Sequence, residues 1–123
     1  MSLEEHFNKI ENVFNNAVFV SVEIKKERKS SNIGLIIGKA RLIDFSEFHF
    51  MEYIEADKKE PIVTYRYHYQ AKNKELIFRY DNSPHHKELK SFPHHKHEKD
   101  KVTHSSHKSL SNIVEEIIMY MKN

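Results

Sequence analysis

The chain contains no cysteine, and this absence excludes disulfide bonds, thiolate zinc sites and a cysteine nucleophile. No apolar run approaches the roughly 20 residues that a membrane-spanning helix needs, so we expect no membrane association. Residues 1–6 are acidic and polar, whereas a secretory signal is basic and then apolar. We therefore expect a cytoplasmic protein.

Glycine and proline are scarce as well, at two and three residues among 123, which favours regular structure with few irregular loops. With 38% hydrophobic residues, the chain can bury one core, so we expect a single domain over residues 1–123. The formal net charge is only +2, and ten imidazoles add positive charge as the pH falls through about 6.5. This charge is compatible with a polyanionic partner without requiring one.

The spacing of apolar residues predicts an α+β fold. Helical spacing in residues 1–15 and 109–122 predicts an N-terminal and a C-terminal helix, both packed on a sheet. Residues 17–81 alternate as strands do, and their short connections favour an antiparallel meander of about five strands. We expect these strands at residues 17–24, 34–43, 45–55, 62–70 and 75–81. The basic residues 25–32 are interpreted as the solvated end of the first strand and a turn.

The last predicted hairpin can be given a register. A short loop within residues 71–74 would pair Tyr67 with Phe78 and Tyr65 with Tyr80. The aromatic side chains then share one face of the sheet, because side chains alternate with a period of two. The other face is mainly polar and carries Arg66, His68, Gln70, Glu75, Ile77, Arg79 and Asp81.

Seven of the ten histidines lie between His85 and His107, in residues 82–108, which we interpret as a histidine-rich loop with a short helix. Imidazole exchanges protons near neutral pH and is a common metal ligand. The histidine spacing matches no zinc motif, and adjacent histidines on an extended chain point in opposite directions. We therefore expect no cofactor. The alternative is a divalent metal bound by the histidine cluster, with Asp81 as a carboxylate ligand.

The same residues could carry acid–base chemistry on RNA. Cleavage of a phosphodiester without a metal needs a base for the 2′-hydroxyl, an acid for the leaving oxygen and a cation for the charged transition state. The candidate catalytic residues are His85, His86, His94, His95, His97, Arg79 and Asp81. The structural alternatives are an Arg79–Asp81 ion pair that fixes a strand end and histidines that merely belong to a solvated loop.

Six further residues are candidates for substrate binding: Arg66, His68, Lys87, Lys96, Asn82 and Glu52. Glu52 interrupts an otherwise apolar alternation, so a buried carboxylate there needs a partner, and Arg66 or Arg79 is the natural one. Asn82 fits equally well in a turn that closes its strand. His6, His49, His104 and His107 are left out of the site.

Three motifs carry a family resemblance: residues 65–70 (YRYHYQ), 78–86 (FRYDNSPHH) and 92–97 (FPHHKH). In this order they resemble the TumE family of toxins from prokaryotic toxin–antitoxin modules, and the likeness extends more loosely to Glu52 and to Ser109 and Leu110. Ser83 is a mild variant of the small residue that usually follows the Asp-Asn pair. The matching residues are Arg79, Asp81, Asn82, His85, His86, His94, His95 and His97.

The resemblance implies a small cytoplasmic toxin that a cognate antitoxin, expected to bind DNA, holds inactive. RNA is the expected target, and an endoribonuclease-like toxin is the working hypothesis; a homodimer is compatible with it. The alternative is a non-catalytic module that docks its basic histidine loop onto RNA or a protein, with steep salt dependence and no turnover. A third interpretation, a structural linker, does not account for the mixture of phenylalanine, proline and histidine.

Overall fold

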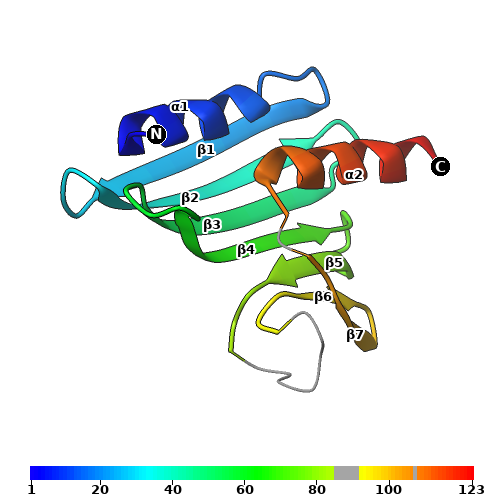
Figure 1. Cartoon of the computed structure of the whole chain (residues 1–123). Coiled ribbons are helices and arrows are strands. Elements are labelled where there is room, and N and C mark those ends of the chain that lie inside the picture. Colours follow the sequence, from blue (N-terminus) through cyan, green and yellow to red (C-terminus); the bar gives the residue numbers. More distant parts are fainter. Residues whose placement is uncertain (85–91, 107) are drawn as a thin grey trace.

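The protein has two helices on one face of a single antiparallel sheet, as seen in a computed structural model that describes residues 1–84, 92–106 and 108–123 (Figure 1). The elements follow the chain as α1 (Leu3–Val13), β1 (Phe19–Arg28), β2 (Ile33–Leu42), β3 (Glu47–Glu55), β4 (Ile62–Gln70), β5 (Leu76–Asp81), β6 (His95–Glu98), β7 (Lys101–His104) and α2 (Leu110–Lys122). The strands lie in the order β1 to β7, so each pairs with its neighbour in sequence. The predicted α+β class and antiparallel meander are confirmed.

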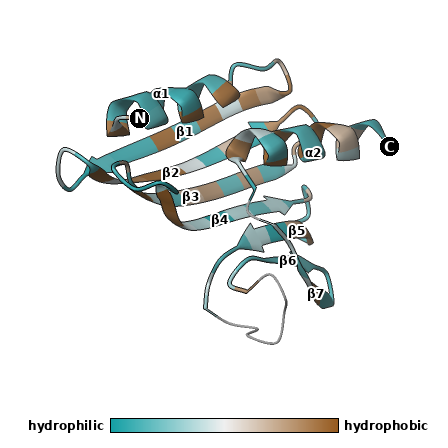
Figure 2. Cartoon of the chain, viewed as in Figure 1, coloured by the Kyte–Doolittle hydropathy of each residue, from teal (hydrophilic) through white to brown (hydrophobic). Residues whose placement is uncertain are grey.

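Both helices begin at a serine whose hydroxyl accepts a backbone N–H. Ser2 caps α1 by accepting from Glu5 N, and Ser109 caps α2 in a capping box with Asn112. The apolar stripes of the helices pack on the aromatic face of the sheet, where Tyr67 and Phe48 are fully buried. The hydrophobic residues of the strands and helices therefore form the core, while the β6–β7 hairpin is mostly hydrophilic (Figure 2).

The prediction of about five strands was too low, because residues 82–108 contain more than a loop. β6 pairs with the outer edge of β5, and β7 pairs with β6. The sequence of β6, HKHE, has no apolar alternation, so its pairing depends on the β5 edge rather than on local propensity. The short helix expected after Ser83 falls largely on residues 85–91, outside the described residues.

The first strand is longer than predicted, because the basic residues up to Arg28 continue it. Lys26 and Arg28 stay on the helix side of this edge strand, where they form ion pairs with Glu11 and Glu4 of α1. The backbone pairing with β2 holds this strand of mostly exposed side chains in place, and the exposed ion pairs add little.

The predicted register of the last hairpin was wrong by two residues. Tyr67 lies opposite Tyr80 and Tyr69 opposite Phe78, with an irregularity between Tyr69 and Gln70. The connecting turn is longer than expected: Ala71 N donates to Glu75 O. A shift of two preserves the face of every side chain, so the predicted aromatic and polar faces are both found.

Candidate active site

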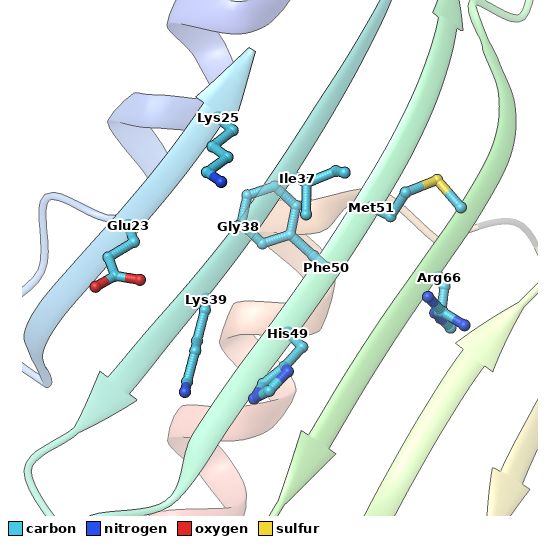
Figure 3. Close-up of a pocket in the computed structure, with 9 residues that line it drawn as sticks. All are labelled: Glu23, Lys25, Ile37, Gly38, Lys39, His49, Phe50, Met51 and Arg66. Atoms are coloured by element: carbon cyan, nitrogen blue, oxygen red, sulfur yellow. The ribbon is translucent and has the colours of Figure 1, made fainter. Parts of the chain in front are cut away.

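Polar and ionisable side chains gather on the sheet face opposite the helices. In Figure 3 this face is toward the viewer, and both helices lie behind the sheet. On adjacent strands, His49 lies opposite His68, His68 opposite Arg79, and Arg79 opposite His97. Since neighbouring strands are about 4.8 Å apart, the Cα atoms of His68 and His97 are about 10 Å apart, with Arg79 between them.

Asp81 lies beside the Arg79–His97 end of this row and contacts three charged or ionisable side chains. Its carboxylate lies 2.7 Å from His95 Nε2, 3.3 Å from His97 Nε2 and 3.1 Å from Arg79 Nε, and it also accepts the N–H of Ser83. Asp81 and His95 are buried, whereas the side chains of His97 and Arg79 are 19% and 34% exposed. The carboxylate can therefore orient two partly accessible groups that a substrate can reach.

His95 is held from both sides of its ring. Nδ1 lies 2.9 Å from the carbonyl oxygen of Pro93, which can only accept, so Nδ1 carries the hydrogen. Nε2 lies 2.7 Å from the Asp81 carboxylate, so both ring nitrogens are in contact with an oxygen. The His95 ring also contacts that of His97 edge-on, with 4.8 Å between the ring centroids.

Asp81, His95 and His97 also form the one group of three metal-type ligands found among the described residues, with donor atoms within 4.8 Å of one another. Three protein ligands are enough for a catalytic zinc site. However, tetrahedral bonds of about 2.0–2.1 Å place donors about 3.3 Å apart. The 2.7 Å contact between Asp81 and His95 is instead a hydrogen-bond distance, so metal binding would require these two side chains to separate.

His68 differs from His95 in its surroundings. Burial lowers the pKa of His68, an effect that its hydrogen bond to Gln70 partly opposes and that the nearby His49, Arg79 and Arg66 reinforce. Its Nε2 lies 2.8 Å from Gln70 Oε1 and acts as the donor, which leaves Nδ1 as the basic nitrogen of the neutral ring. Arg79 therefore lies between an imidazole whose neutral form is favoured, that of His68, and the imidazole of His97, which contacts the Asp81 carboxylate.

Glu47 lies at the other end of this face and was not among the predicted site residues. It is buried, and its pKa is lowered to about 2, chiefly by the hydrogen bond from Lys74 and the charge of Lys39. Gln70 also donates to Glu47, so Glu47 is connected to His68 through Gln70. The alternation of apolar residues predicted the strand β3. It carried no sign that cationic side chains would cover a carboxylate on the polar face of this strand.

Comparison with known proteins now identifies the family. The model of the family described as "Toxin TumE" matches residues 7–123, nearly the whole chain. The chain belongs to the TumE toxin family. No curated protein and no solved structure matches it. Membership of this toxin family implies a cognate antitoxin as partner. Neither described helix is long and apolar enough to cross a bilayer.

The TumE motif residues are divided between the two faces of the sheet. Arg79, Asp81, His95 and His97 meet on the open face. His94 instead stacks on Tyr65 and hydrogen-bonds its hydroxyl at 2.8 Å. His85, His86 and Lys87, three further candidates, lie outside the described residues.

Two candidates for substrate binding have structural contacts instead of facing the row. Lys96 is on the helix side, 3.0 Å from Glu116 and over the rings of Phe78 and Tyr80. Asn82 accepts from Tyr65 N and donates to Val63 O, which extends the pairing of β4 beyond the end of β5. Arg66 is exposed on the open face, beside Asp81 in the register.

The expected pairing of Glu52 with Arg66 or Arg79 was wrong. Glu52 is fully buried on the helix side, where it accepts from Tyr67 Oη and lies 2.7 Å from His6 Nε2. The two arginines project from the opposite face and cannot reach it. His6, left out of the site, lies three residues from Leu3 in the apolar stripe of α1, and this spacing was the signal of its burial.

Proposed function

We propose that this TumE-family protein is a toxin that cleaves RNA with His68 as general base, His97 as general acid and Arg79 as the cation between them. One observation carries the proposal: the three side chains lie opposite one another on β4, β5 and β6. A phosphodiester centred over Arg79 would have an imidazole on each side. This order, base, cation and acid, is what in-line cleavage of RNA without a metal requires.

The reaction would begin when neutral His68 removes the proton from a 2′-hydroxyl. The 2′-oxygen then attacks phosphorus, the bond from phosphorus to the 5′-oxygen breaks, and His97 gives its proton to that leaving oxygen. The products are a 2′,3′-cyclic phosphate and a 5′-hydroxyl. The lowered pKa of His68 favours the neutral form that a base needs. The Asp81 carboxylate lies 3.3 Å from His97 Nε2, where it can orient the ring of the proposed acid.

In this proposal Asp81 and His95 are positioning residues. Asp81 contacts both Arg79 and His97, and His95 fixes Asp81 through a buried contact. The roles resemble those of a carboxylate that orients a catalytic histidine in other hydrolases. The partners of the proposal are RNA as the target and an antitoxin as the inhibitor, and we expect that antitoxin to bind DNA.

The test is expression from a tight promoter, with growth and the integrity of total RNA measured together. We expect growth arrest with RNA fragmentation for the wild type, and neither for folded His68→Ala and His97→Ala. His104→Ala is the matched control, because this histidine is exposed on the edge strand β7. Fragmentation that persists in folded His68→Ala and His97→Ala would refute the assignment. Arrest with intact RNA would refute the action on RNA.

A further inference from the structure

A hollow of about 340 Å³ opens on the polar sheet face over β1 to β4, and Arg66 at its edge lies opposite Asp81 on the adjacent strand (Figure 3). Ile37 and Met51 lie opposite each other on β2 and β3 and form its apolar part together with Gly38 and Phe50. Ile37 is 45% exposed, so its apolar side chain is accessible to a ligand in the hollow. The volume falls in the range of small-molecule sites, about 300–1,000 Å³.

The rim of the hollow is cationic. Lys25, Lys39 and Arg66 line it, together with one exposed carboxylate, that of Glu23. Figure 3 shows these side chains on β1, β2 and β4 around Ile37, Phe50 and Met51. Positive groups around an apolar floor suit a ligand with anionic links and flat apolar faces, which describes a nucleotide chain.

The register connects the hollow with Asp81, which contacts the proposed catalytic residues Arg79 and His97. Lys25, Ile37, Met51, Arg66 and Asp81 lie opposite one another on the five strands β1 to β5. At about 4.8 Å between strands, Met51 is about 10 Å and Ile37 about 14 Å from Asp81 along this row. An extended strand of nucleic acid laid across the sheet would therefore contact both places at once.

We propose that the hollow binds one unstacked base of single-stranded RNA against Ile37 and Met51, with flanking phosphates on Lys25, Lys39 and Arg66. This inference rests on the proposed function, because it takes the RNA of that reaction as the occupant. Single-stranded RNA is favoured over duplex, since a base must leave its stack to reach the floor of the hollow. The protein would then hold its substrate a few nucleotides away from the bond that it cleaves.

The experiment measures binding without cleavage. Fluorescence anisotropy would use a labelled single strand of about twelve nucleotides with every 2′-hydroxyl methylated, so that the attacking group is blocked. Met51→Glu places a carboxylate on the floor, and Met119→Glu is the matched control, because Met119 is 58% exposed on α2, on the far side of the sheet. Lys25→Gln removes one positive charge from the rim and is a milder change than Met51→Glu. Lys122→Gln is its control.

We expect Met51→Glu to raise the dissociation constant roughly tenfold or more and Lys25→Gln by roughly threefold, with both controls near the wild type. Circular dichroism and thermal melting establish whether each variant is folded. If Met51→Glu does not fold, the affinity of Lys25→Gln decides whether the hollow binds RNA. Equal affinity of the folded floor and rim variants and their controls would overturn the inference. Loss of antitoxin copurification in Met51→Glu, with unchanged RNA affinity, would overturn it in favour of a protein interface.

The two proposals can fail separately. Weakened binding in Met51→Glu, combined with no cleavage of unmodified RNA by the wild type, supports the hollow and refutes the nuclease. Cleavage by the wild type that is equally efficient in Met51→Glu and Met119→Glu supports the nuclease and refutes the hollow as part of its substrate site.

Discussion

Replacement of Glu47 by glutamine should remove a pH-dependent part of the stability. The surrounding cations lower the pKa of the Glu47 carboxyl from 4.5 to about 2, so the ionised form is favoured in the folded state. Such a difference is equivalent to about 3 kcal/mol. The side chains of Lys39, Arg41 and Lys74 are 50%, 50% and 66% exposed, so solvent screening reduces the contribution to about 1–2 kcal/mol.

The sign follows from the lowered pKa. The contribution is fully present above pH 4.5, where Glu47 is ionised in both the folded and the unfolded chain, and it is lost as the pH falls toward about 2. Urea denaturation of wild type and Glu47→Gln, repeated between pH 7 and pH 2.5, measures this directly. We expect a difference of about 1–2 kcal/mol at pH 7 that shrinks strongly at low pH.

The matched control for this prediction is Glu23→Gln, an exposed carboxylate on the same sheet face. It should change the free energy of unfolding by less than about 0.5 kcal/mol at any of these pH values. If the difference between wild type and Glu47→Gln were constant over the whole pH range, the cations around Glu47 would not be the cause of its contribution, and the reasoning would be refuted.

Three further predictions concern the centre of the sheet. Asp81→Asn should destabilise the fold by about 1–3 kcal/mol in urea denaturation, because it removes a carboxylate oxygen that buried His95 contacts at 2.7 Å; an unchanged midpoint would contradict a stabilising role of that contact. Gly38→Ala should lower the melting temperature and cost about 1–3 kcal/mol of stability, since a Cβ there would lie 2.1 Å from the Phe50 ring. Adding Phe50→Leu should restore part of this stability, and a double variant without any recovery would contradict the clash. The His68 ring should titrate below pH 6.5 by NMR, so its contribution to stability is present above that pH and declines as the pH falls further; a midpoint above 6.5 would contradict burial as the dominant cause.

Much of the fold follows from local patterns. The apolar spacing of α1 and α2 and the alternation in β2 to β5 depend on side chains that each element buries by itself. The β6–β7 hairpin could not be predicted in this way, since its residues gain strand structure from the edge of β5. The register error at Tyr69 has a similar origin: an irregular position and a longer turn add residues that no pattern marks.

The candidate site was predicted as a set of residue types rather than as an arrangement. Arg79, Asp81, His95 and His97 were selected, but their meeting depends on β6, which was not expected. His68 was placed on the correct face by alternation, and its position opposite Arg79 required the true register. Hence a sequence can nominate a histidine cluster, while the pairing of three strands decides which of its members face one another.

The most direct test of the central claim is incubation of the purified protein with total RNA in the presence of a chelator, followed by analysis of the RNA ends. The account predicts fragments with 2′,3′-cyclic phosphate and 5′-hydroxyl ends for the wild type, and none for folded His68→Ala or His97→Ala. Loss of wild-type cleavage on chelation, or fragments with 5′-phosphate ends, would contradict acid–base catalysis by these two histidines.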